Sequence, residues 1–125
     1  MQAYLIVFLG AGIGGSMRHG VNVASLALFG PGFPLGTLFV NIVGSFAMGA
    51  LVEWFALKID PGMAWRLFLT TGVLGGFTTF SAFSLDAALL FERGSHWAAA
   101  AYVLLSVALS IAGLFAGLML VRQLA

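Results

Sequence analysis

The chain has 125 residues, of which 62% are hydrophobic and only 7% are charged, with a formal net charge of +1. Soluble domains carry about 25% charged residues, so this composition excludes a water-facing globular protein and predicts an integral membrane protein. The net charge carries no information about a nucleic-acid partner, but the lack of Lys/Arg runs argues against one. The lack of cysteine excludes disulfides and thiolate metal sites.

Four hydrophobic windows are long enough to cross a bilayer, because a spanning helix needs about 20 mostly apolar residues. They cover residues of about 3–28, 34–57, 63–91 and 95–121, each near or above that length. The breaks between them contain glycine or proline, as turns between helices do. Loops this short make neighbouring spans antiparallel. We therefore expect an all-α membrane protein whose four helices form a single transmembrane domain.

Charge placement specifies the orientation of the chain only weakly. With four spans, one side holds Lys58, Arg66 and Arg122, and the other holds Arg93 and at most Arg18. The positive-inside rule needs a clearer Lys/Arg excess than this. Insertion in both orientations, and with it an antiparallel homodimer, is therefore open.

Each window also contains two small residues four positions apart, which allow helix backbones to approach closely. Packing within one chain and a seam between two copies account for these pairs equally well. The pairs are Gly10 and Gly14, Ser45 and Gly49, Gly72 and Gly76, and Gly113 and Gly117.

In the first window, Arg18 lies well inside the apolar stretch. An arginine at depth is costly and usually faces a protein interior or a water-filled vestibule. We expect a vestibule position. The alternative is that the helix ends near Arg18 and its side chain reaches the headgroups.

In the second window, Asn41 shares one helix face with Thr37 and Ser45 at four-residue spacing. A threonine can bond its own preceding turn, whereas an asparagine amide in hydrocarbon needs a partner elsewhere. We expect Asn41 to face a polar pathway rather than only to bond a neighbouring helix.

The third window contains a stretch, residues 72–84, with three glycines, two adjacent threonines and two serines. Within hydrocarbon, such a stretch is tolerated only where protein or a water-filled cavity covers it. It predicts a broken helix that lines a site, with Phe80 and Phe83 beside the break. Carbonyls freed by the break, at Gly75, Gly76 or Thr78, could also hold a bare cation if two copies met there.

In the fourth window, Tyr102, Ser106 and Ser110 form a stripe of hydroxyls on one helix face. Together with Asn41, they make the embedded polar groups mostly hydrogen-bond donors, whereas cation pathways generally use carboxylates or carbonyl rings. The positive edges of the Phe80 and Phe83 rings add to this donor character. The pattern favours passage of a small anion, and no set of nucleophile and base suggests an enzyme.

At these residues the chain resembles the CrcB, or Fluc, family of fluoride channels over essentially its whole length. The resemblance is carried by residues 14–18, by Gly36-Thr37-Leu38 with Val40-Asn41, and by the GxxGGxTTFSxF pattern of residues 72–83. One departure is Ala82, where the family commonly has threonine. It removes one hydroxyl from the break and leaves open any role assigned to that hydroxyl.

The resemblance implies a passive fluoride channel that relieves fluoride toxicity in the plasma membrane of a prokaryote, the inner membrane if Gram-negative. It implies an antiparallel, dual-topology homodimer in the lipid bilayer, with two pores and a structural sodium ion at the dimer centre. By match to its motifs, Arg18 would lie in a vestibule, and the backbone carbonyls of Gly75 and Thr78 would hold sodium. The fluoride pathway would be lined by Asn41, Phe80, Phe83, Thr37, Tyr102, Ser106 and Ser110.

Two other functions compete with this interpretation. Small multidrug exporters also have four helices, but as a family they depend on a membrane-embedded glutamate in the first span, and this first window contains no acid. A purely structural subunit would tolerate substitution of Asn41 or Phe80 without any change in ion flux.

Overall fold

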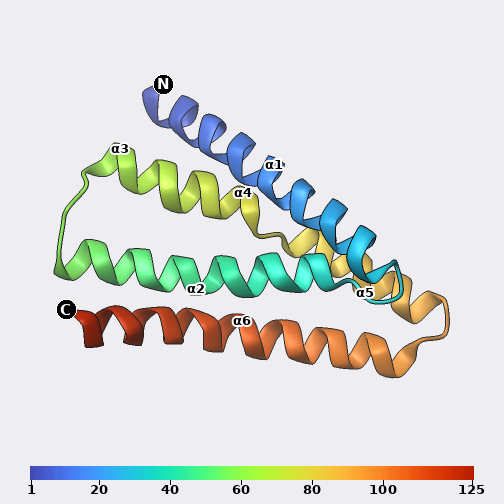
Figure 1. Ribbon diagram of the computed structural model, residues 1–125. Helices are drawn as coiled ribbons and strands as arrows, with labels where there is room; N and C mark the ends of the chain where they lie inside the picture. The colour runs from blue at the N-terminus through green and yellow to red at the C-terminus, as the bar shows by residue number, and fades with distance from the viewer.

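The computed structural model describes all 125 residues as helices joined by short loops, without strands. Four rods run back and forth, so that both termini and the loop after α2 lie at one end (Figure 1). The third rod is divided into four successive pieces. The helices are α1 (Gln2–Phe29), α2 (Leu35–Leu57), α3 (Met63–Arg66), the π-helix η1 (Leu67–Leu74), α4 (Gly75–Phe77), α5 (Phe80–Glu92) and α6 (His96–Leu124).

Three of these rods are long and apolar enough to cross a membrane: Leu35–Leu57, Met63–Glu92 and His96–Leu124. The fourth rod, α1, covers the first predicted window and has 28 residues, but it is not among those three. Its Arg18, His19 and several glycines lower the mean hydropathy of that helix.

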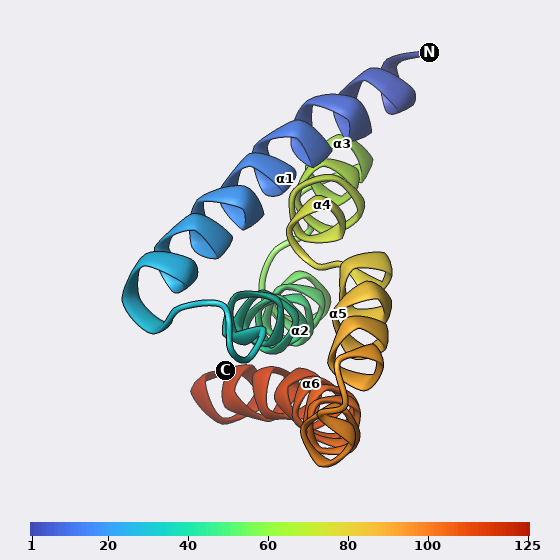
Figure 2. The ribbon, with the colours of Figure 1, turned by 90° about the vertical axis from the view of Figure 1, so that its right-hand side faces the viewer.

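The rods form two packed pairs. α2 runs alongside α6, while α1 crosses η1 and α4 and diverges from α2 towards its N-terminus (Figures 1 and 2). Glycines bring both pairs close. A Cβ on Gly14 would collide with the Val73 carbonyl oxygen, and one on Gly49 with the Leu114 carbonyl oxygen.

The other glycines of the predicted small-residue pairs behave in the same way. A Cβ added to them would meet backbone of a neighbouring helix in the same chain. These glycines are Gly10, Gly72, Gly76, Gly113 and Gly117. Packing within one chain therefore accounts for them, and Ser45 instead lines a cavity described below.

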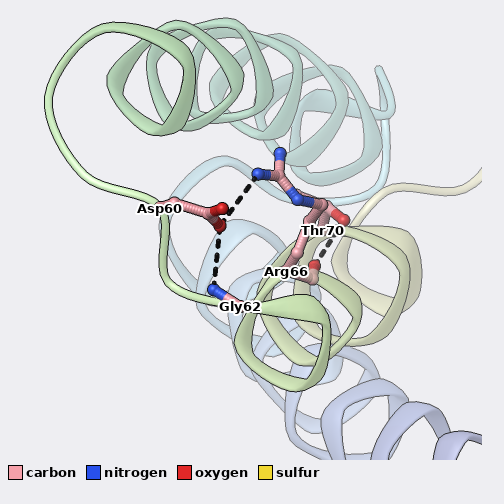
Figure 3. Close-up of polar contacts among 4 residues, drawn as sticks. All are labelled: Asp60, Gly62, Arg66 and Thr70. Carbon is pink, nitrogen blue, oxygen red and sulfur yellow. Dashed lines mark hydrogen bonds and ion pairs between the residues drawn. The ribbon is translucent and has the colours of Figure 1, made fainter.

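The third rod begins at a local network of polar contacts (Figure 3). Asp60 accepts a hydrogen bond from the Gly62 amide at 3.0 Å and pairs with Arg66 at 3.6 Å. The Thr70 hydroxyl donates to the Arg66 carbonyl at 2.6 Å, where α3 passes into η1. Gly62 has φ +87°, a conformation that glycine adopts without strain, and it directly precedes α3.

Between α4 and α5 the backbone leaves the helical conformation for two residues. Thr78 has φ −85° and ψ 157°, and Thr79 has φ −153° and ψ 121°. This segment, residues 78–79, is called the break below. The Thr79 hydroxyl accepts from the Ala82 amide at 3.1 Å and so caps the N-terminus of α5.

Candidate functional site

The break lies against α2, and Asn41 joins the two. The Thr79 amide donates to Asn41 Oδ1 at 2.8 Å, and Asn41 Nδ2 donates to the Thr79 carbonyl at 3.0 Å. The amide of Asn41 therefore satisfies both backbone polar groups of one non-helical residue. One N–H of Nδ2 remains for a further partner, because a carboxamide has two donor hydrogens.

Beside this contact lies an open cavity of about 330 Å³, called the central cavity, lined by α2, the break, α5 and α6. It is lined by five of the seven residues predicted to line a pathway, and also by Thr78 and Thr79. None of its ten lining residues is acidic. The five are Asn41, Phe80, Phe83, Ser106 and Ser110.

Two hydroxyls in the central cavity have no hydrogen-bond partner. Ser106 Oγ and Ser110 Oγ are buried and bond nothing in the chain. An unpaired buried hydroxyl is a cost that native structures rarely carry without a reason. Together with the free N–H of Asn41, these hydroxyls give the cavity unused donors from two helices.

The other two predicted pathway residues lie outside this cavity. Tyr102 is fully buried, at 0% exposure, and its ring centroid is 5.2 Å from that of Phe83. Thr37 lines a second cavity of about 310 Å³, between the C-terminal end of α1, the start of α2 and α5. The seven residues predicted to line one pathway are therefore divided between two cavities, and Phe83 and Tyr102 lie between them.

Sequence reasoning missed Asp86. The phenol of Tyr102 donates to Asp86 Oδ2 at 3.2 Å, and Asp86 lines the second cavity together with Thr37. Asp86 is not among the residues predicted to line a pathway, which were chosen for their hydrogen-bond donors. The available signal was its spacing, because Asp86 follows Phe83 by three residues and shares its helix face.

Arg18 contacts the backbone just before the break. Its Nε donates to the Gly76 carbonyl at 3.1 Å, and the residue is half-buried. Arg18 lines neither of the two cavities. Its guanidinium has five N–H donors, so this single bond leaves it able to bind a second partner.

The two residues predicted to hold sodium lie on either side of α4. Gly75 begins α4 and is exposed, and Thr78 follows α4 as the first residue of the break. The amide and the hydroxyl of Thr78 both donate back to the Leu74 carbonyl at 3.0 Å, so the oxygens of Thr78 are what remains for another partner.

The unpaired hydroxyls give a test of what the central cavity is for. We predict that Ser106→Ala and Ser110→Ala leave the thermal unfolding midpoint of the purified protein unchanged or raise it, since no hydrogen bond is lost. Asn41→Leu leaves at least the Thr79 carbonyl unpaired, at a cost of about 1–3 kcal/mol, and is predicted to lower that midpoint markedly. A clear destabilisation by the serine variants would contradict this and assign the hydroxyls a structural role.

Comparison with known proteins agrees with the resemblance stated above. The family model described as CrcB-like protein, Camphor Resistance (CrcB), matches residues 5–118.

Three similar proteins carry the name fluoride-specific ion channel FluC. The protein of Methylobacterium nodulans is 61% identical over 95% of both chains. That of Granulibacter bethesdensis is 58% identical over 99% of this chain and 98% of its own. That of Rhodopseudomonas palustris is 57% identical over 98% of this chain and 99% of its own. The chain belongs to the CrcB family.

Proposed function

We propose that this protein is a fluoride channel that lets fluoride leave the cell passively and so relieves its toxicity. The observation that carries the proposal is the central cavity, where the free N–H of Asn41 and the unpaired hydroxyls of Ser106 and Ser110 converge. Similar proteins of the same length are named fluoride-specific ion channels. Since they are bacterial, we place this chain in the plasma membrane of a prokaryote.

The chemistry of the cavity suits a small, strongly hydrated anion. An ion that enters must exchange its water for other hydrogen-bond donors, or the loss of hydration excludes it. Ser106, Ser110 and Asn41 supply such donors, and no carboxylate in the cavity repels an anion. Phe80 and Phe83, whose centroids are 5.4 Å apart, add positive ring edges. Conduction of this kind requires no covalent step.

From the central cavity we propose that the path continues past Phe83 and Tyr102 to the second cavity. There Thr37 offers a further hydroxyl, and Asp86 holds the Tyr102 phenol. We assign Arg18 to a vestibule, where its remaining guanidinium donors attract anions. Tyr102 is fully buried between the two cavities, so its phenol must move for an ion to pass.

We propose further that two copies form an antiparallel, dual-topology homodimer with α1 as the fourth span of each. Phe80 borders the central cavity yet is 76% exposed, so one protomer leaves this part of the path uncovered. A second copy would cover it and give two pores. The excess of Lys and Arg at one end of the rods is only one or two residues, too small to fix a single orientation, which agrees with insertion in both.

A sodium ion is also part of this proposal. Carbonyl oxygens are suitable ligands for a hard cation, and helical breaks supply them at membrane depth. In a continuous helix the Thr79 amide would donate to the Gly75 carbonyl, but here it donates to Asn41. In the same way, the Ala82 amide would donate to the Thr78 carbonyl, but here it donates to the Thr79 hydroxyl. Both residues therefore fit the role of sodium ligands that join the two copies.

Ion flux from liposomes tests the function directly. We predict that purified wild-type protein releases fluoride rapidly, read by an ion-selective electrode, without matching release of chloride. Asn41→Asp places a carboxylate at the cavity and is predicted to lower fluoride release by at least about tenfold, or about 1.4 kcal/mol. The variant must remain folded and dimeric for the comparison to count. Wild-type protein that is folded and releases no fluoride would contradict the proposal.

Dual topology has its own test, because the chain contains no cysteine. A single Gln123→Cys variant places one thiol at the exposed C-terminal end of α6. In cells, a membrane-impermeant thiol reagent is predicted to label about half of the protein from outside, as expected for equal insertion in both orientations. The other half should react only after the membrane is permeabilised. Complete labelling from one side alone would contradict dual topology.

A further inference from the structure

The polar groups around the break are paired in an unusual order. In a continuous helix each amide donates to the carbonyl four residues before it. Here the Thr79 amide donates to Asn41 Oδ1 at 2.8 Å, and the Ala82 amide donates to Thr79 Oγ1 at 3.1 Å. Two side chains therefore take the donors that would otherwise go to the carbonyls of Gly75 and Thr78.

Two other carbonyls, one just before the break and one within it, accept hydrogen bonds from side chains. The Gly76 carbonyl accepts from Arg18 Nε at 3.1 Å, and the Thr79 carbonyl accepts from Asn41 Nδ2 at 3.0 Å. The carbonyls of residues 75–79 thus include two kinds. Those of Gly76 and Thr79 accept hydrogen bonds from side chains. Those of Gly75 and Thr78 do not receive the amide that a continuous helix would supply, because that amide bonds a side chain instead.

We infer that Asn41 is a positioning residue for the cation site as well as a residue of the anion path. By accepting from the Thr79 amide, Asn41 prevents that amide from returning to the Gly75 carbonyl, and its Nδ2 holds the break in place. This inference rests on the proposed function for the identity of the cation. It makes the anion path and the cation site one hydrogen-bonded unit, joined through a single carboxamide.

The two halves of the carboxamide have separable effects. Asn41→Asp keeps an oxygen that accepts from the Thr79 amide, so that amide does not return to the Gly75 carbonyl, while both N–H donors, the one to the Thr79 carbonyl and the one into the cavity, are lost. Asn41→Val removes both functions and allows the Thr79 amide to bond Gly75 again. Thr79→Val removes the acceptor for the Ala82 amide and frees that amide for the Thr78 carbonyl.

The test is a titration of thermal stability with Na⁺. The unfolding midpoint of purified, full-length protein is measured as choline chloride is replaced by sodium chloride at constant ionic strength. Binding to the folded state alone raises the midpoint as the concentration of Na⁺ rises. Wild-type protein is expected to show this rise. Asn41→Asp should keep it, and Asn41→Val should lose it or need at least about tenfold more Na⁺.

Thr79→Val provides a second variant in case Asn41→Val does not fold, and it is also expected to weaken the response to Na⁺. Ser106→Ala is the matched control, since Ser106 lines the same cavity but makes no hydrogen bond to the break. It should retain the full response to Na⁺ while its fluoride release falls. A full response in Asn41→Val or in Thr79→Val would overturn the inference.

Failure of the inference and failure of the proposed function are distinguishable. Wild-type protein that releases fluoride but has the same midpoint in sodium and choline would overturn the inference and leave the channel function intact. Wild-type protein that releases no fluoride but shows the predicted pattern of Na⁺ responses would overturn the function and support the role of Asn41.

Discussion

Backbone amides and carbonyls that leave a helix inside hydrocarbon must find other partners, since no water is there to serve them. In this chain the requirement falls on Thr78 and Thr79, which are extended in the middle of the third rod. Asn41 from α2 pairs with the amide and the carbonyl of Thr79. Arg18 from α1 bonds the Gly76 carbonyl just before the break, and the Thr79 hydroxyl takes the Ala82 amide just after it. Three of the four rods therefore meet at the break, and the central cavity lies beside it.

The same contacts account for the properties of the site. Because Asn41 is fixed by two bonds to the break, its remaining N–H has a defined direction and needs little reorganisation to meet an ion. Ser106 and Ser110 are carried by α6, which packs along α2 and so has a stable position relative to Asn41. Preorganised donors in a site with little water bind an anion more strongly than the same groups in solution. Phe80 lines the same cavity and is 76% exposed, so the chain by itself leaves that side of the cavity open.

Much of this arrangement could be predicted from the sequence, because the relevant patterns are local. The windows reflect hydropathy, the turns contain Gly30, Gly62 and Gly94, each with positive φ, and the stripe of Ser106 and Ser110 follows from helical spacing. The glycine pairs were ambiguous for a physical reason. Spacing shows that a face permits close approach, but not whether the approaching backbone belongs to the same chain.

What sequence reasoning missed depends on contacts between distant residues. Asn41 was expected to face a pathway rather than only to bond a neighbouring helix. It lines the central cavity, and its two bonds to Thr79, 38 residues away, were not predicted. Likewise, Asp86 joins Tyr102 across 16 residues and two helices. A hydropathy pattern carries no information on which polar groups meet across such separations.

The central claim is that this cavity passes fluoride down its own gradient. The most direct measurement is the reversal potential of wild-type protein in a planar bilayer, with a tenfold fluoride gradient and equal chloride on both sides. A fluoride-selective channel predicts reversal near the fluoride equilibrium potential, about 59 mV for a monovalent ion. A current that reverses near zero, or no current from protein shown to be folded and inserted, would contradict the account.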